Sequence, residues 1–219
     1  SLTPVLPALL GRLRHLFDSS ARPDVIGAQL ARDALLASAV ARHPGLRVPG
    51  AFDGFELAVR AILGQQITVK AATTIAGRFA AAFGDALDTP HAGLSQLAPT
   101  SHRIATASVD EVARVGIIAT RARSIIALAQ EIESGRLRLE PGAPPEATIA
   151  QLVALPGIGP WTAHYIAMRA LRWPDAFPKE DIALRNALGG ATAARAEELS
   201  QPWRPWRSYA TLHLWCGGA

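Results

Sequence analysis

Apolar residues recur at helical spacing along almost the whole chain. Leu6, Leu9, Leu10 and Leu13 are three and four residues apart, which places them on one face of an α-helix. Alternating apolar and polar runs, typical of half-buried strands, are rare, and Pro and Gly divide the chain into short segments. The sequence therefore predicts an all-α fold of short helices. The helices are expected near residues 4–17, 24–41, 54–67, 68–83, 108–114, 119–134, 146–154, 160–172, 181–188 and 206–216, with irregular connections at 84–103 and 135–148.

The composition fits one packed globular unit. The chain has 219 residues, of which 49% are apolar and 18% charged, values that exclude a disordered chain. No apolar run reaches the roughly 20 residues that span a bilayer, and the first residues lack the pattern of a secretory leader. Cys216 is the only cysteine, which excludes intramolecular disulfides and four-cysteine metal clusters. We expect no membrane partner and a cytoplasmic, bacterial setting.

The charged residues leave two interpretations open. The formal net charge is +4, and arginine supplies all the basic residues except Lys70 and Lys179. Guanidinium groups bind phosphates in a bidentate manner, which favours a polyanionic partner. An arginine-rich composition is equally typical of a GC-rich genome, so charge alone does not decide.

The segment Leu155–Ala163, LPGIGPWTA, is the most informative stretch. Gly157 and Gly159 allow a tight turn that brings backbone N–H groups close to a ligand, and Pro160 suits the first position of the next helix. The positive end of that helix would complete an anion site for one DNA phosphate, with Thr162 in its first turn. Ile158 is expected to anchor the hairpin in the core. The alternative is an ordinary turn between two helices.

This string resembles the helix-hairpin-helix of DNA glycosylases. Further along, Phe177–Asp181 (FPKED) resembles the Gly/Pro loop and aspartate that give the helix-hairpin-helix–Gly/Pro–Asp superfamily its name, with Asp181 lying 20 residues after Trp161. Three further stretches, FELAVRAILGQQIT, WTAHYIAMR and WRPWRSYATLHLW, are similar to the alkylation-repair branch typified by bacterial 3-methyladenine DNA glycosylase II. The resemblance covers roughly residues 5–216.

The resemblance implies a single glycosylase unit over residues 1–219 with two helical lobes and a cleft between them. One lobe would comprise 55–172, including the hairpin 155–162, and the other 1–54 with 173–219. The β-rich N-terminal domain usual in this branch is expected to be absent, and the protein to be a monomer. Its partner would be double-stranded DNA containing damaged bases.

Asp181 is the candidate catalytic residue. It precedes a predicted helix, where its carboxylate would accept backbone N–H bonds and stay ionised at the positive helix end. By resemblance, this carboxylate stabilises the positively charged sugar as the base leaves, or orients the attacking water. The alternative is a plain helix cap; Glu180 is the local competitor, but Asp181 matches the aspartate of the family.

Aromatic residues are the candidates for the base pocket. Trp161, Tyr165 and Met168 share one helix face, a pattern that core residues also show. By resemblance, Trp161, Tyr165 and Trp215 line the pocket, whereas Met168 is expected in the core. Electron-rich rings attract cations such as N3- and N7-alkylated purines.

Position 161 also distinguishes two reaction types. Members resembling endonuclease III carry a lysine there, whose Schiff base with the sugar leads to strand cleavage; this chain has Trp161. The iron–sulfur cluster of that branch cannot form with one cysteine. We therefore expect neither cofactor nor catalytic metal, although hairpin carbonyls could hold a monovalent cation.

Gln65 and Gln66 follow Gly64 at the end of a predicted helix. In the family this turn carries the residue inserted into the duplex in place of the flipped base, and Gln66 is the matching residue. Relatives often use an apolar residue such as leucine, so Gln66, with Gln65 beside it, departs from the pattern. The alternative is two polar residues that end a helix.

The sequence thus predicts a monofunctional glycosylase that flips and excises alkylated, cationic purines such as 3-methyladenine and 7-methylguanine, leaving an abasic site. The main alternative is a non-catalytic helix-hairpin-helix module that binds DNA within a larger alkylation-response protein. A glycosylase for uracil, mismatched or oxidised bases and a helical protein adaptor are further alternatives.

Overall fold

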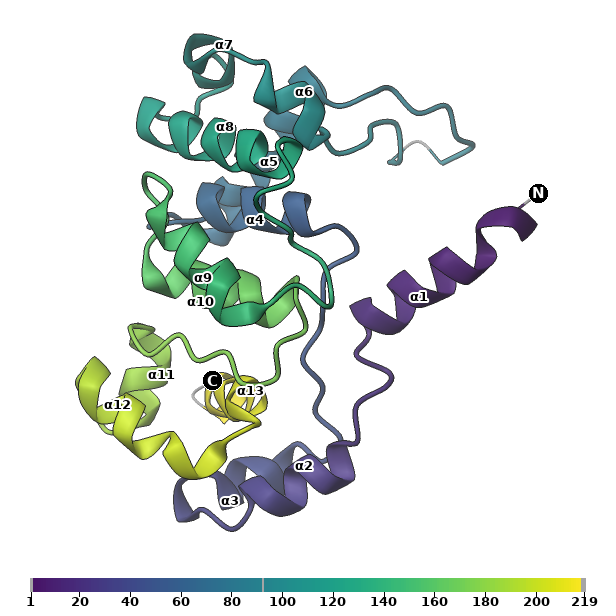
Figure 1. Cartoon of the computed structure of the whole chain (residues 1–219). Coiled ribbons are helices and arrows are strands. Elements are labelled where there is room, and N and C mark those ends of the chain that lie inside the picture. Colours follow the sequence, from purple (N-terminus) through teal and green to yellow (C-terminus); the bar gives the residue numbers. More distant parts are fainter. Residues whose placement is uncertain (1, 92, 218–219) are drawn as a thin grey trace. The chain divides into compact units, whose positions relative to one another are not determined.

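The computed structural model of the chain describes residues 2–91 and 93–217. Within these residues the chain forms thirteen α-helices and two short 3₁₀-helices but no strand (Figure 1). An isolated bridge between Ala86 and Gln96 is the only β-type pairing of the described part. The all-α fold expected from the sequence is therefore confirmed. No helix in these ranges is both long and apolar enough to cross a membrane.

The chain divides into two compact units, which are considered one at a time. Unit 1 comprises Ser1–Phe52 with His164–Ala219, and unit 2 comprises Asp53–Ala163. The second boundary lies inside a helix, earlier in the chain than the lobe boundary expected after residue 172.

Unit 2 is organised around one helix. It contains α4 (Gly54–Leu63), α5 (Val69–Phe83), α6 (Ser101–Ala105), α7 (Val109–Ala113), α8 (Ala119–Glu133), α9 (Pro145–Ala154) and the first turn of α10 (Pro160–Arg169). Helix α8 packs against α4, α6 and α7 (Figure 1). Its residues Ile125, Leu128 and Ala129 are completely buried, because their three- and four-residue spacing forms one apolar face. Short α7 is stabilised by a capping box between Ser108 and Glu111.

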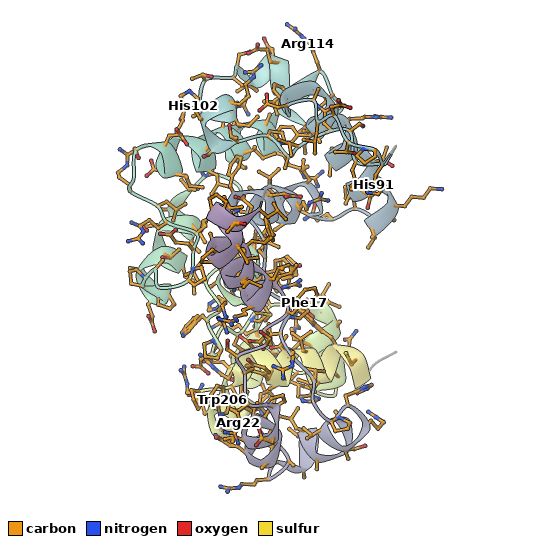
Figure 2. All side chains as sticks on the ribbon, turned by 90° about the vertical axis from the view of Figure 1, so that its right-hand side faces the viewer. Phe17, Arg22, His91, His102, Arg114 and Trp206 are labelled. Carbon is orange, nitrogen blue, oxygen red and sulfur yellow. The ribbon has the colours of Figure 1, made fainter. Side chains whose placement is uncertain are left out.

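Unit 1 has the C-terminal helix at its centre. It contains η1 (Thr3–Val5), α1 (Leu6–Leu16), α2 (Pro23–Leu30), α3 (Ala34–Arg42), the rest of α10, α11 (Ile182–Ala187), α12 (Ala193–Leu199), η2 (Gln201–Trp203) and α13 (Arg207–Gly217). Helix α13 packs against both α3 and α11. Trp203 is 1% exposed, whereas Trp206 lies at the surface of the unit (Figure 2) and donates its indole N–H to Gln29 Oε1 at 3.0 Å.

Three sequence predictions of local structure were wrong. The helix expected over 24–41 is divided into α2 and α3, because the Asp33 carboxylate caps α3 by accepting the N–H of Leu35 and also accepts the Trp203 indole N–H at 2.6 Å. The connection 84–103, expected to be irregular, contains the start of α6, which Thr100 caps through the N–H of Arg103. Helix α12 lies where no helix was expected.

Candidate functional site

The hairpin between α9 and α10 has a position that strongly favours glycine. Gly157 has a φ of +75°, in the region that disfavours residues with a Cβ. A Cβ there would overlap the hydroxyl of Ser124, a residue of α8 that is 1% exposed. Ile158 is 3% exposed, which confirms that it anchors the hairpin in the core of unit 2.

The other side of the hairpin is open. A Cβ at Gly159 would meet no atom within 4 Å, and Gly157, Gly159 and Pro160 are all exposed. The carbonyl of Gly159 accepts the N–H of Ala163 at 3.0 Å, so α10 begins directly after the turn. Because the first N–H groups of a helix lack intrahelical partners and lie at its positive end, this hairpin can bind an anion such as a phosphate.

The turn between α4 and α5, Gly64–Thr68, is called the wedge turn after the role that the family resemblance predicts for Gln66. Gln66 is exposed and has a φ of +56°. The half-buried Gln65 instead donates its side-chain Nε2 to Gly157 O at 3.1 Å and to Thr162 Oγ1 at 3.2 Å. The structure thus brings Gln65, Thr162 and Gly157 together, and leaves Gln66 as the exposed glutamine of the wedge turn.

Asp181 is the N-cap of α11, in unit 1. Its Oδ1 accepts the N–H of Leu184 at 2.7 Å and the indole N–H of Trp215, on α13, at 3.0 Å. The helix start expected at Asp181 is confirmed. The contact with Trp215 brings together two predicted site residues that are 34 positions apart. Two N–H donors on one oxygen fix the position of the carboxylate.

The loop that leads to Asp181 is fixed by a buried ion pair. Arg207 and Asp175 are 3% and 5% exposed, and the Arg207 guanidinium binds the Asp175 carboxylate at 2.8 and 2.9 Å. Arg207 also reaches Glu197 Oε1 at 2.9 Å. A paired and fully hydrogen-bonded charge of this kind can remain ionised inside a protein. Sequence reasoning missed Asp175, since no short-range pattern links it to Arg207.

His164 is a second support of this loop that the sequence did not indicate. Its Nδ1 accepts the backbone N–H of Phe177 at 3.3 Å. Burial is the largest influence on the imidazole and holds the pKa of His164 below its usual range. The neutral ring is the form that can accept this bond, so His164 joins α10 to the loop before Asp181.

The remaining predicted pocket residues lie on α10. Trp161 is half-buried in the first turn of α10, within unit 2, and Tyr165 is half-buried in the part that belongs to unit 1. Arg169 donates to the Tyr165 hydroxyl at 3.2 Å, and its guanidinium lies 5.5 Å from the ring centroid. Met168 is 1% exposed, which confirms it as a core residue.

The described residues contain no group of three or more His, Cys, Asp or Glu side chains that could hold a metal ion. Of the two lysines, Lys70 is exposed in the first turn of α5. The Nζ of Lys179 lies 3.6 Å from Glu197 Oε2, within ion-pair distance.

A sequence profile described as "HhH-GPD superfamily base excision DNA repair protein" matches residues 59–204, more than half of the chain. The chain belongs to the HhH-GPD superfamily. A second profile, described as "AlkA N-terminal domain", matches residues 1–53. Within these residues, the described part of the chain forms helices α1 to α3.

The chain is also similar to named DNA repair proteins. It is 43% identical over 208 residues to the probable bifunctional transcriptional activator/DNA repair enzyme AlkA of Mycobacterium tuberculosis, covering 93% of this chain and 41% of that protein. It is 35% identical over 214 residues to DNA-3-methyladenine glycosylase 2 of Escherichia coli, covering 98% and 73%. The chain thus spans less than half of the mycobacterial relative.

The fold agrees with a solved structure. The 3-methyladenine DNA-glycosylase from Archaeoglobus fulgidus superposes with a TM-score of 0.81 at 23% identity, covering 97% of this chain and 75% of that one. This similarity shows a shared HhH-GPD fold.

Proposed function

We propose that the chain is a monofunctional DNA glycosylase that excises alkylated purines carrying a positive charge, such as 3-methyladenine and 7-methylguanine, from double-stranded DNA. The observation that carries the proposal is the Asp181 carboxylate, held by the Leu184 N–H and the Trp215 indole in a chain of a base excision repair superfamily. The names of the relatives, which include 3-methyladenine glycosylases, support this class of substrate.

A fixed carboxylate suffices for this reaction because the substrate is already activated. When the bond between C1′ of the sugar and the ring nitrogen breaks, its electron pair neutralises the alkylated base, and positive charge develops on the sugar. Asp181 would stabilise that charge electrostatically. A water oxygen then bonds to C1′, and its proton passes to Asp181 or to solvent. The products are the neutral base and an abasic site in an intact strand.

The aromatic residues are proposed to receive the flipped base. Trp161 and Trp215 offer electron-rich faces that attract a cationic purine by roughly 0.5–2 kcal/mol each. Tyr165 carries a guanidinium near its ring, that of Arg169, which favours a supporting role for Tyr165 over direct stacking on a cation.

The DNA contacts are proposed to come from unit 2. The backbone at Gly157 and Gly159, with α10 behind it, would bind one phosphate. Thr162 would support the hairpin through Gln65, which donates to its hydroxyl. Gln66 would fill the space that the flipped base leaves and could hydrogen-bond the orphaned partner base. One such set of contacts reads one lesion, so the active form is proposed to be a monomer.

The proposal excludes strand cleavage by a lysine. Schiff-base formation needs a neutral amine next to the sugar, and the position directly after the hairpin holds Trp161. Lys179, the lysine of the loop before Asp181, instead lies within ion-pair distance of Glu197.

The test is incubation with methylated duplex DNA, with unmethylated duplex as the control. We expect 3-methyladenine or 7-methylguanine to be released from the methylated duplex alone, strands to stay intact until heated, and borohydride to trap no covalent complex. Trapping at either lysine would refute the monofunctional mechanism. Tight, salt-sensitive binding of duplex DNA without base release would refute the proposed enzyme activity and favour the non-catalytic DNA-binding module instead.

A further inference from the structure

The wedge turn has few backbone hydrogen bonds of its own. The N–H of Gln65 reaches Ile62 O at 3.3 Å and that of Ile67 reaches Gly64 O at 3.5 Å, both at the long end of the range. Between them Gln66 adopts a left-handed φ of +56°, which non-glycine residues keep only when the surroundings enforce it. A turn of this kind needs support from other elements to present a side chain in one position.

That support comes from α8. The half-buried guanidinium of Arg121 donates through Nη2 to the backbone carbonyl of Gln65, 56 positions earlier in the chain. The side chain of the same glutamine donates to Gly157 O and Thr162 Oγ1 in the hairpin. Gln65 is thereby held at its backbone carbonyl by α8 and at its side-chain carboxamide by the hairpin.

Helix α8 also contacts the hairpin directly. Ser124 lies three residues after Arg121 and is 1% exposed. Its hydroxyl, which donates to Thr120 O at 3.1 Å, occupies the space that a side chain at Gly157 would need. The first turns of α8 therefore touch both the wedge turn and the hairpin, and all these contacts lie within unit 2.

We propose that Arg121 is a positioning residue for base flipping: it holds the wedge turn against α8 so that Gln66 is presented rigidly, while Gln65 couples the turn to the phosphate-binding hairpin. The inference rests on the proposed function and adds a residue to it. Inserting a side chain into the duplex requires neighbouring bases to unstack, which costs free energy. A turn that changes conformation during insertion would therefore stabilise the flipped state less. A planar guanidinium with several donors suits this task because an arginine side chain loses less conformational entropy per hydrogen bond than a lysine side chain does.

Three variants separate this role from charge and from folding. Arg121→Ala removes the donor, and Arg121→Lys keeps the charge with a weaker donor. Arg123→Ala removes the same charge from an exposed position two residues along α8 and is the matched control. Thermal unfolding of each variant establishes that it is folded.

The first readout needs no activity. In amide hydrogen exchange of the free protein, we expect Arg121→Ala to accelerate exchange at residues 64–68 at least about tenfold relative to the core of α8, as local opening predicts. Arg121→Lys should restore most of the protection, and Arg123→Ala should match the parent. Unchanged exchange at 64–68 in folded Arg121→Ala would overturn the proposal.

The second readout concerns flipping. In single-turnover release of 7-methylguanine, we expect Arg121→Ala to be slower by about tenfold or more, while its affinity for unmodified duplex and the salt dependence of that affinity stay as in the parent. An equal loss in unmodified-duplex affinity, with a smaller salt slope, would instead make Arg121 a phosphate contact. If the parent itself releases no base, the proposed function fails, and hydrogen exchange alone decides whether Arg121 holds the turn.

Discussion

The two hairpin glycines should respond very differently to the same substitution. Gly157→Ala places a Cβ at a φ of +75°, which costs roughly 1–2 kcal/mol. The new Cβ also overlaps the Ser124 hydroxyl, so this buried group must rotate and give up its bond to Thr120 O, worth about 1 kcal/mol. We therefore expect Gly157→Ala to lower the free energy of unfolding by about 2–3 kcal/mol, summed from these two terms.

Gly159→Ala is the matched control in the same turn. Its Cβ would meet nothing within 4 Å, and its φ lies outside the left-handed region. Alanine is a poorer N-cap than glycine by roughly 0.5–1 kcal/mol, and reduced freedom of the unfolded chain returns about as much. Its stability should stay within about 0.5 kcal/mol of the parent. Since the added methyl lies on the open face of the hairpin, its duplex affinity should fall.

Urea unfolding of the two variants, followed by duplex binding, makes the comparison. In a Ser124→Ala background, where the bond to Thr120 O is already absent, Gly157→Ala should cost only the φ term of about 1–2 kcal/mol, because the nearest remaining atom, the Cβ of residue 124, is 3.7 Å away. Equal stability of Gly157→Ala and Gly159→Ala would refute this account of the hairpin.

Three further substitutions or conditions test the support of Asp181. Arg207→Met leaves Asp175 buried with Arg204 as its remaining ionic partner and should lower the free energy of unfolding by about 3 kcal/mol, the low end of the cost of breaking a buried pair, in urea titrations; a loss under 1 kcal/mol would contradict this. Burial holds the pKa of His164 and of two further histidines below the usual 6.5, so the unfolded state binds more protons below that pH. The contribution of these histidines to the free energy of unfolding should be fully present above pH 6.5 and fall in more acidic solution by at most about 1.4 kcal/mol per pH unit for each histidine. A rise in the free energy of unfolding on acidification to pH 5 would contradict this direction. Trp215→Phe keeps an aromatic ring but removes the N–H bound to Asp181, and should slow base release about tenfold in the otherwise unchanged chain but clearly less once Asp181 is Asn, because the part of the loss that acts through the carboxylate is then absent; equal losses in the two backgrounds would show that the indole acts on the base alone.

Local chemistry made the hairpin and the Asp181 cap predictable. The positions of Gly157 and Pro160 follow from backbone rules that act within a few residues, and the burial of Ile158 follows from the same turn. The N-cap at Asp181 likewise needs only its own side chain and the next helical turn.

Contacts between residues far apart in the chain could not be predicted from the sequence patterns. The break between α2 and α3 depends on Asp33, whose carboxylate also accepts the indole N–H of Trp203, 170 positions away. In the same way, the bond from Arg121 to Gln65 joins segments 56 positions apart, and nothing in RAR or GQQ indicates it. The spacing of residues predicts helices, whereas pairs of this kind depend on how the helices pack.

The most direct test of the central claim is single-turnover release of 7-methylguanine and 3-methyladenine by the parent and by Asp181→Asn. Asparagine keeps an oxygen that can accept from Leu184 and Trp215, so the substitution removes charge while conserving shape. Loss of a charge that stabilises the transition state predicts release at least about 100-fold slower, with unchanged affinity for duplex containing an abasic analogue. Release by Asp181→Asn at the rate of the parent would contradict the role of Asp181 as the group that stabilises the positively charged sugar as the base departs.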